Sequence, residues 1–447
     1  MPNDYLDHLS QFAASLSWDR LPGSARSAAK DVALDTIGAI LAGCRLPENA
    51  ALARFASSQG GGPAIILGHG YKAQPMFAAL ANATAGVAME VDEGTRLGGG
   101  HPAIHTLPGA LAVAEEKGLG GKKLLEALVA GYEVSSRIGG ATVAKPIVHS
   151  HGTWGTIGTA VAVARLLDFD APKMRQVINL AASMTPANTW TPCYEGATIR
   201  NVYPGRSGMQ GILAVHLQQC GFTGLRDGPS DVYGRLLADS FDPQAAVVGL
   251  GKPPYRIEQN YFKFHACCLF NHPTLDAIAA LLQDRPFTPA DVKSIKVTTV
   301  PPASQMGGPY PPNRLSAKFN IPYAVASLIV NHRSDIPAFE PAAIDNPQIK
   351  QLAAKISLST DAKMSLRDPK GPVAAVSIAL NNGHTLDRDA AVHHGDFQSP
   401  RPRQSLVDKF LNFARPTCGQ DGSNYALMAL EKLEDLPNVR QLTLYLG

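Results

Sequence analysis

One stretch near residue 100 gathers the side chains that proton-transfer chemistry uses. It contains three acids, three consecutive glycines and two histidines, in the order Glu90, Asp92, Glu93, Gly98–Gly100, His101 and His105. A carboxylate orients an imidazole, and an imidazole moves protons near neutral pH. Because an alanine-rich segment with helical spacing follows, these groups lie at the start of a helix, where anions also bind. The stretch predicts a pocket that handles protons and an anion.

Three later segments carry complementary groups: HSHGTWG (149–155), GATIRNVYPGR (196–206) and YFKFHACC (261–268). In the first, His149 and His151 precede a predicted helix, where they can meet an anion or simply form a capping turn. In the second, Arg200 and Arg206 flank a tyrosine, and arginine is the natural bidentate partner of a carboxylate. In the third, Lys263 lies among aromatic residues, so we expect desolvation to lower its pKa and make it a usable base. The four segments together favour proton abstraction beside a carboxylate of a small polyanion.

The sequence shows no fingerprint of a cofactor or a metal. The two glycine triplets, 60–62 and 98–100, follow no predicted strand, so neither is a dinucleotide-binding loop. His149 and His151 have the spacing of metal ligands, but no third ligand lies nearby in the sequence. We therefore predict neither a cofactor nor a metal.

Composition excludes other classes of partner. The formal charge is only +3 and the basic residues are scattered, which argues against nucleic acid binding. No apolar run reaches the length of about 18 residues that a membrane span needs. The first twenty residues lack the apolar core of a signal peptide, and the six cysteines have no disulfide or zinc spacing. We expect a cytoplasmic protein.

Apolar periodicity predicts the elements that must position these groups. The predicted helices are 4–17, 24–43, 76–90, 103–117, 122–138, 155–167, 172–184, 205–220, 321–331, 347–356, 406–414 and 424–433. No strand is predicted before about residue 265, and strands are predicted at 293–300 and 373–380. The many alanines and glycines of the early helices indicate closely packed helix backbones.

This order of elements predicts a mainly α protein. A large helical bundle is formed by both ends of the chain, residues 1–265 plus 403–447, because a short helical tail needs an existing core on which to pack. A smaller α+β domain, residues 266–402, is inserted between them.

The segments resemble those of the MmgE/PrpD family, which includes 2-methylcitrate dehydratases, cis-aconitate decarboxylases and iminodisuccinate epimerase. The resemblance extends over nearly the whole chain through LDTIGAILAG (34–43), EVDEGTRLGGGHP (90–102), HSHGTWG (149–155), GATIRNVYPG (196–205), GFTG (221–224), FKFHACCLFNHPTLDAI (262–278) and LSAKFNIPYAVA (315–326). It implies a helical domain with an inserted α+β domain, a homodimer, and a small polycarboxylate as substrate.

The resemblance also implies roles for individual residues. The matching positions are catalytic histidines and a lysine (His101, His149, Lys263), a substrate-contacting threonine (Thr95) and an acid (Glu90 or Asp92). Three positions differ from the decarboxylase branch: Arg200 replaces a lysine, and Tyr203 and Cys268 each replace a histidine. Since arginine is a poor proton shuttle, decarboxylation of cis-aconitate is the least favoured of the three activities.

The shared chemistry is removal of a proton next to a carboxylate, with cationic donors stabilising the charge that develops. We predict that Lys263 faces one of His101, His149 or Tyr203 across the substrate carbon. Arg200, Arg206 and the glycine amides then hold the carboxylates, and Cys268 lies beside them. The chain length and the DEG…GHPAIH form of the first motif resemble the iminodisuccinate epimerase branch more than the dehydratases, so we predict an epimerase with two bases. A dehydratase of the 2-methylcitrate type is the alternative, and a catalytically silent protein that binds a small acid is the alternative outside enzymes.

Overall fold

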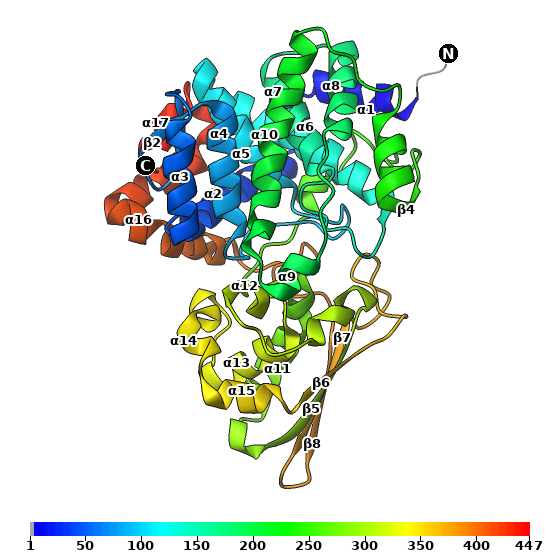
Figure 1. Cartoon of the computed structure of the whole chain (residues 1–447), viewed down its shortest axis with the longest axis vertical. Helices are drawn as coiled ribbons and strands as arrows, with labels where there is room; N and C mark the ends of the chain where they lie inside the picture. Colours follow the sequence, from blue (N-terminus) through cyan, green and yellow to red (C-terminus); the bar gives the residue numbers. More distant parts are fainter. Residues whose placement is uncertain (1–3) are drawn as a thin grey trace.

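The computed structural model describes residues 4–447, and the chain is mainly α-helical. Figure 1 shows a helical part and, beside it, a smaller part that contains a twisted sheet. In the helical part the helices are α1 (Tyr5–Ser15), α2 (Gly23–Gly43), α3 (Pro47–Ser58), α4 (Pro75–Val87), α5 (Pro102–Lys117), α6 (Gly121–Gly140), α7 (Gly155–Leu166), α8 (Ala171–Ser183), α9 (Thr191–Glu195), α10 (Val202–Gln219), α16 (Arg403–Glu431) and α17 (Arg440–Thr443). Both ends of the chain therefore contribute to this part.

The centre of the helical part is packed through small residues. A Cβ atom added to Gly131 of α6 would lie 2.3 Å from the Gly158 carbonyl of α7, and one added to Gly109 of α5 would lie 2.5 Å from Thr159. These helix backbones approach so closely that only glycine fits. The predicted close packing of the early helices is confirmed.

The smaller part combines a four-stranded sheet with short helices. The sheet order is β6 (Ile356–Thr360), β5 (Val292–Thr299), β7 (Ala374–Leu380), β8 (Thr385–Ala390), with β5 and β6 parallel and the other pairs antiparallel. Alternate residues of β7 are buried, which explains its strand-like sequence. The helices of this part are α11 (His272–Asp284), α12 (Arg314–Ala317), α13 (Ile321–Asn331), α14 (Pro341–Ile344) and α15 (Pro347–Ala353).

Two hydrophobic cores correspond to the two parts. The first contains residues between Tyr5 and Ile257 together with residues between Leu406 and Leu446. The second is built mainly from residues between Ala266 and Ala390. The mainly α class with an inserted α+β part is confirmed, while the boundaries at 265/266 and 402/403 stay a prediction, and residues 1–3 of the first range lie outside the described residues.

The prediction that no strand precedes residue 265 was wrong. Two short antiparallel pairs occur in the helical part, β1 (Ala64–Ile66) with β2 (Tyr71–Ala73) and β3 (Thr142–Ala144) with β4 (Ala238–Phe241). Elements this short are too brief to show a period-2 pattern. Within residues 4–447, no helix has both the length and the apolar character that crossing a membrane requires.

Candidate active site

A cavity of about 890 Å³ lies between the two parts of the chain. The helical part contributes residues of the loop before α5 and the loop before α7, and the α+β part contributes residues 300–305 and 362–367. Of the predicted site residues, six line the cavity: Glu90, Thr95, His101, His149, Arg200 and Cys268. The other four, Asp92, Tyr203, Arg206 and Lys263, lie behind or beside its wall.

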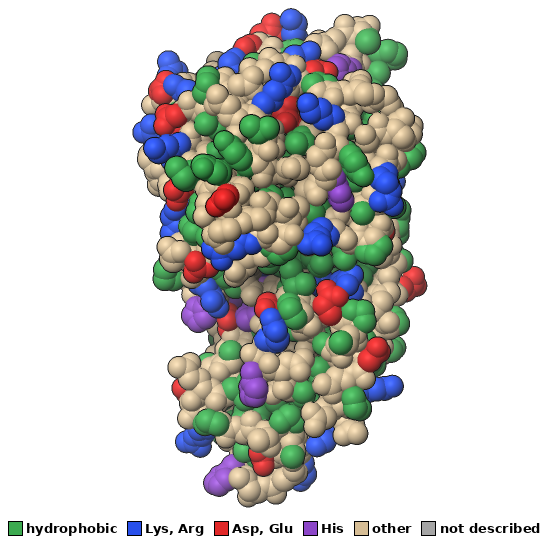
Figure 2. Space-filling model, turned by 90° about the vertical axis from the view of Figure 1, so that its left-hand side faces the viewer, with side chains coloured by type: hydrophobic (Ala, Val, Ile, Leu, Met, Phe, Trp, Pro, Cys, Tyr) green, Lys and Arg blue, Asp and Glu red, His purple; other side chains and the backbone are tan. Residues whose placement is uncertain are grey.

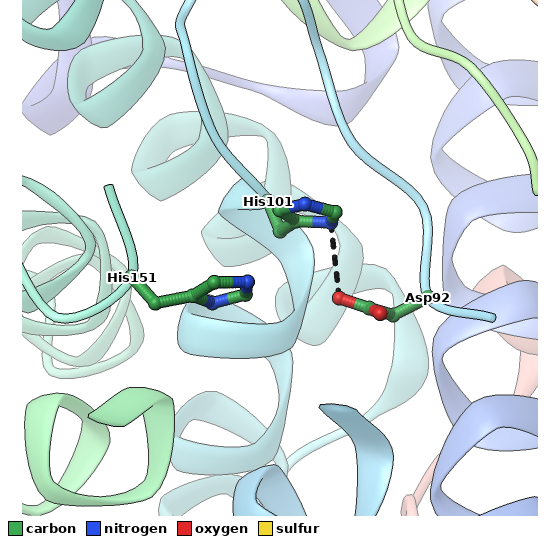
Figure 3. A group of neighbouring side chains, drawn as sticks. All are labelled: Asp92, His101 and His151. Carbon is green, nitrogen blue, oxygen red and sulfur yellow. Dashed lines mark ion pairs between the residues drawn. The ribbon is translucent and has the colours of Figure 1, made fainter. Parts of the chain in front are cut away.

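His101 has the geometry of a general base. Its Nδ1 lies 3.0 Å from Asp92 Oδ2 and 2.7 Å from the Glu93 carbonyl oxygen. The Glu93 carbonyl can only accept, so Nδ1 carries a hydrogen that it donates to this oxygen, and the Asp92 carboxylate lies beside it as an ion-pair partner. Nε2 lies 3.5 Å from the Tyr261 hydroxyl, and both residues line the cavity. Figure 3 shows the Asp92 carboxylate directed at the His101 ring.

A glycine turn delivers His101 to the cavity. Thr95 and Gly100 pair as an antiparallel bridge, and Gly99 between them has φ +61°. Gly98 lies against α6, where a Cβ atom would come within 2.9 Å of Ser136. The turn ends at His101, which is the N-cap residue of α5. These glycines are therefore required by backbone shape, as expected of a turn and unlike a nucleotide loop.

Glu90 is held between two cations in the cavity wall. It forms ion pairs with Arg200 and, at 2.9 Å, with Lys263 Nζ, which also lies 3.6 Å from Asp92. Burial raises the pKa of Glu90, but the charges of Arg200 and Lys263 outweigh it and leave the pKa lowered. For Asp92, burial likewise opposes ionisation, but Lys263 and His101 leave its pKa lowered. Both acids are carboxylates at neutral pH.

The expectation that Lys263 has a lowered pKa was wrong. The side chain is fully buried, and burial does act to lower its pKa, but Glu90 and Asp92 outweigh that effect and raise it. Lys263 is an ammonium ion that neutralises two acids. It is not among the residues that line the cavity, and its predicted place opposite His101 stays a prediction.

Three further histidines surround His101. His105 donates from Nδ1 to the His101 carbonyl (2.7 Å) and accepts at Nε2 from Gly152 N–H (3.0 Å), so its role is structural. His151 stacks on His101 with ring centroids 4.6 Å apart, and neither of its ring nitrogens has a partner within residues 4–447. His149 accepts at Nδ1 from His151 N–H at 2.9 Å. Burial lowers the pKa of His149 and His151 well below the usual value, so both are neutral.

The remaining predicted residues have defined surroundings. Thr95 donates to the Gln259 carbonyl at 3.0 Å, and Cys268 is a thiol whose pKa burial raises to about 12. Arg206 donates to Asn188 Oδ1 at 2.7 Å, and the Tyr203 ring packs edge-on against His149. In this structure Arg206 and Tyr203 do not border the cavity.

Two residues to which the sequence analysis gave no role also belong to the cavity wall. Tyr261 is paired through its backbone with Gly94, at which a Cβ atom would lie 2.5 Å from the tyrosine hydroxyl. Arg96 forms a buried ion pair with Asp396 at 2.8 Å, and so ties the loop before α5 to the loop after β8. Tyr261 lies two residues before Lys263, and that position was its only signal in the sequence.

Asp92, His101 and His151 place ligand atoms within 4.8 Å of one another. Figure 3 shows the His151 ring directed toward the other two side chains. The sequence suggested His149 and His151 as a possible pair of metal ligands. In the structure His149 is not part of the set, and its Nδ1 accepts a hydrogen bond from the backbone N–H of His151. Asp92 is already shared by Lys263 and His101, so a cation would have to compete with an ammonium ion for the only carboxylate of the set.

Glu93 differs from the two acids beside it. Burial raises its pKa to about 8, although its oxygens accept from Ala103 N–H (2.8 Å) and the Tyr132 hydroxyl (3.1 Å). A carboxyl whose pKa is raised on folding destabilises the folded protein increasingly as the pH rises from 4.5, the ordinary pKa of the group, to about 8. Glu93→Gln is therefore expected to raise Tm more at pH 8 than at pH 5. Thermal unfolding of both proteins checks this, and an equal Tm difference at the two pH values would contradict it.

Charge on the outer surface is mixed. Figure 2 shows acidic and basic side chains interspersed over the face that it presents, without a stripe of one sign.

The site therefore combines three features described above. They are the His101 imidazole beside Asp92, the buried network of acids and cations, and the cavity of about 890 Å³.

The fold is thus a helical bundle with an inserted α+β part, and His101, paired with Asp92, lines the cavity between the two parts. The chain belongs to the MmgE/PrpD family: residues 7–238 match the MmgE/PrpD N-terminal domain, and residues 265–435 match the MmgE/PrpD C-terminal domain.

Three relatives illustrate the similarity. The chain is 25% identical to the cis-aconitate decarboxylase of Mus musculus over 401 residues, which cover 83% of this chain and 78% of that protein. It is 24% identical to the human cis-aconitate decarboxylase over 390 residues, covering 83% and 79%. It is also 24% identical to the cis-aconitate decarboxylase-like protein oryM of Aspergillus oryzae over 440 residues, covering 91% and 89%.

Proposed function

We propose that the protein is a cofactor-independent acid–base lyase that acts on a small di- or tricarboxylate. The observation that carries this proposal is His101, which lines the cavity with Nδ1 beside the Asp92 carboxylate and Nε2 3.5 Å from the Tyr261 hydroxyl. Such an imidazole removes a proton next to a carboxylate, and Asp92 stabilises the imidazolium that forms. The relatives, which are named as decarboxylases, support chemistry at such a carbon.

Substrate binding is assigned to polar groups of the cavity wall. Arg200 lines the cavity, and its Nε has no partner within the described residues. A substrate carboxylate can accept from this guanidinium while Thr95 contacts a second polar group. The negative charge that develops when the proton leaves is then adjacent to a fixed cation, which is the electrostatic stabilisation that this reaction needs.

The geometry favours a lyase over the epimerase predicted from the sequence. An epimerase needs a second base on the opposite face of the substrate carbon, and Lys263, the residue expected there, is a buried ammonium ion. His101 and His151 instead stack on each other. His101 can accept the proton and, as the imidazolium that forms, return it to a hydroxyl that leaves from the same face, so that water and a carbon–carbon double bond are produced. The epimerase is the second candidate, because His149 and His151 are further neutral imidazoles at the cavity.

Decarboxylation of cis-aconitate is the third candidate. It is supported by the names of the relatives and opposed by Arg200, Tyr203 and Cys268, which replace a lysine and two histidines of that branch. Homodimer formation and a cytoplasmic location stay predictions.

One assay separates these functions. The protein is incubated with a panel of di- and tricarboxylates in D2O and followed by ¹H NMR. A dehydratase turns a saturated hydroxy acid into a product with a new olefinic signal, an epimerase exchanges the α-proton with inversion, and a decarboxylase is recognised by the release of CO2, which is measured separately. We expect the olefinic signal. Unchanged spectra with every compound would contradict the enzymatic proposal and favour a silent acid-binding protein.

A further inference from the structure

The segment that carries the acids is held from outside the cavity by two buried lysines. Lys318 Nζ donates to the Met89 carbonyl at 2.9 Å, and Lys409 Nζ donates to the Val91 carbonyl at 2.7 Å. The carboxylates of Glu90 and Asp92 form ion pairs with Lys263 instead. Along residues 89–92 a lysine-bound backbone carbonyl therefore alternates with a lysine-bound side-chain carboxylate.

The two lysines come from parts of the chain that are distant in sequence. Lys318 follows α12 in the α+β part, is fully buried, and also donates to the Ala266 carbonyl at 3.0 Å. Lys409 lies on α16 and also pairs with Asp35 of α2 at 2.6 Å. Burying an ammonium ion is costly. A site that needed only packing would be satisfied by an apolar side chain, so both lysines must serve the groups that they bind.

The backbone that they bind is strained. Glu90 has φ +54°, in the left-handed region that non-glycine residues rarely adopt. Such a conformation costs about 1–3 kcal/mol and persists only where neighbouring structure enforces it. The Met89 carbonyl belongs to the peptide on one side of Glu90, and the Val91 carbonyl belongs to the peptide that leads into Asp92. Rotation of either peptide would move the Asp92 carboxylate relative to the His101 ring.

We infer that Lys318 and Lys409 are positioning residues that fix the Met89 and Val91 carbonyls and thereby keep the Asp92 carboxylate and the Glu93 carbonyl on Nδ1 of His101. Neither lysine borders the cavity, so neither touches the substrate. The catalytic consequence rests on the proposed function, but the effect on His101 does not. Through these two contacts, the α+β part and the C-terminal helix set the geometry of a site in the helical part.

The tautomer of His101 tests the inference directly. The full chain is labelled with ¹⁵N-histidine, and the His101 signal is assigned among the thirteen histidines by its loss in His101→Gln. In the wild type we expect the hydrogen on Nδ1. In Lys318→Met and in Lys409→Met we expect mixed Nδ1–H and Nε2–H tautomers, because the segment that carries both the Asp92 carboxylate and the Glu93 carbonyl is no longer held against Nδ1.

Exposed lysines supply the matched controls. Lys296→Met on β5 and Lys432→Met at the end of α16 should leave the His101 signal unchanged. If either Met variant fails to fold, Lys318→Gln or Lys409→Gln retains an N–H donor for the carbonyl without the charge and is measured instead. A His101 tautomer that stays on Nδ1 in folded variants of both lysines would overturn the inference.

Kinetics give a second readout once a substrate has been found. Each variant should lower kcat by about 100-fold, which is the loss that a displacement of about 1 Å can cause, while KM changes by less than about threefold. If the two lysines acted independently, the double variant would lose about 10⁴-fold in kcat, the product of the two single losses. The loss should be much smaller than this product, because both lysines act on one segment. Losses that multiply fully would contradict a shared segment. If the wild type turns over none of the compounds, the lyase proposal fails, and the tautomer measurement still decides the role of the lysines.

Discussion

His101→Gln is expected to lower turnover by about 10²–10⁴-fold, the contribution typical of a general acid–base group. The amide of Gln can still donate to the Glu93 carbonyl, so the turn before α5 should keep its shape. The variant lacks a group that accepts and returns a proton near neutral pH. KM should change little, because Thr95 and Arg200 are assigned to binding. Steady-state kinetics with the substrate found by NMR measures both constants.

The matched control for this substitution is His384→Gln. His384 is exposed in the α+β part, in the turn between β7 and β8, so turnover should stay within about twofold of the wild type. Full activity of the folded His101→Gln protein would remove His101 from the mechanism.

Lys263→Met is expected to lower the free energy of unfolding by about 3–5 kcal/mol at pH 7, as breaking a buried ion pair does. The variant leaves Glu90 and Asp92 buried with one cation fewer. Because Lys263 contributes to lowering the pKa of both acids, their pKa values should rise in the variant. Urea unfolding measures the change, and activity should fall as well because Asp92 loses its partner.

The pH dependence of this loss has a definite sign. An acid whose pKa is lowered on folding stabilises the protein above its ordinary pKa, and that contribution disappears as pH falls. The difference between wild type and Lys263→Met should therefore narrow as pH falls from 7 toward the ordinary carboxyl values of 3.8 and 4.5. Lys370→Met, at an exposed position in a loop, should show no deficit. If Lys263→Met lost as little free energy of unfolding at pH 7 as Lys370→Met does, the stabilising role of the Lys263–Glu90–Asp92 network would be contradicted.

Most of the long helices were predictable because burial leaves a strong periodic signature, but α3 and α11 were missed. Helices α5 and α6 begin and end within a residue or two of the predicted ranges, since proline begins α5 and Gly118 ends it in a left-handed conformation. The strands β6 and β8 were missed. Each has mostly exposed or half-buried residues at the edge of the sheet, so its sequence lacks the alternation that identified β7. The predicted helices 406–414 and 424–433 correspond to the two halves of α16, which the non-helical residue Gly419 separates.

The residue types that form the site could be predicted from the sequence, but their protonation states could not. The sequence shows that acids, imidazoles, arginine and lysine are present, and the structure places six of the ten predicted residues at one cavity. The sequence could not show that Lys263 contacts two carboxylates, because Glu90 lies 173 positions away along the chain. Desolvation alone lowers the pKa of a lysine, and only the three-dimensional contacts reverse that direction. Tyr261 was missed for a related reason, since its contact with His101 depends on the approach of Gly94.

A crystal structure of the His101→Gln protein with the polycarboxylate that the wild type converts would show whether proton abstraction takes place at residue 101. We expect the ligand to occupy the cavity between the two parts of the chain. One carboxylate should lie at Arg200, and the carbon that loses the proton should face residue 101. A ligand bound outside this cavity, or one whose reacting carbon faces away from residue 101, would contradict this expectation.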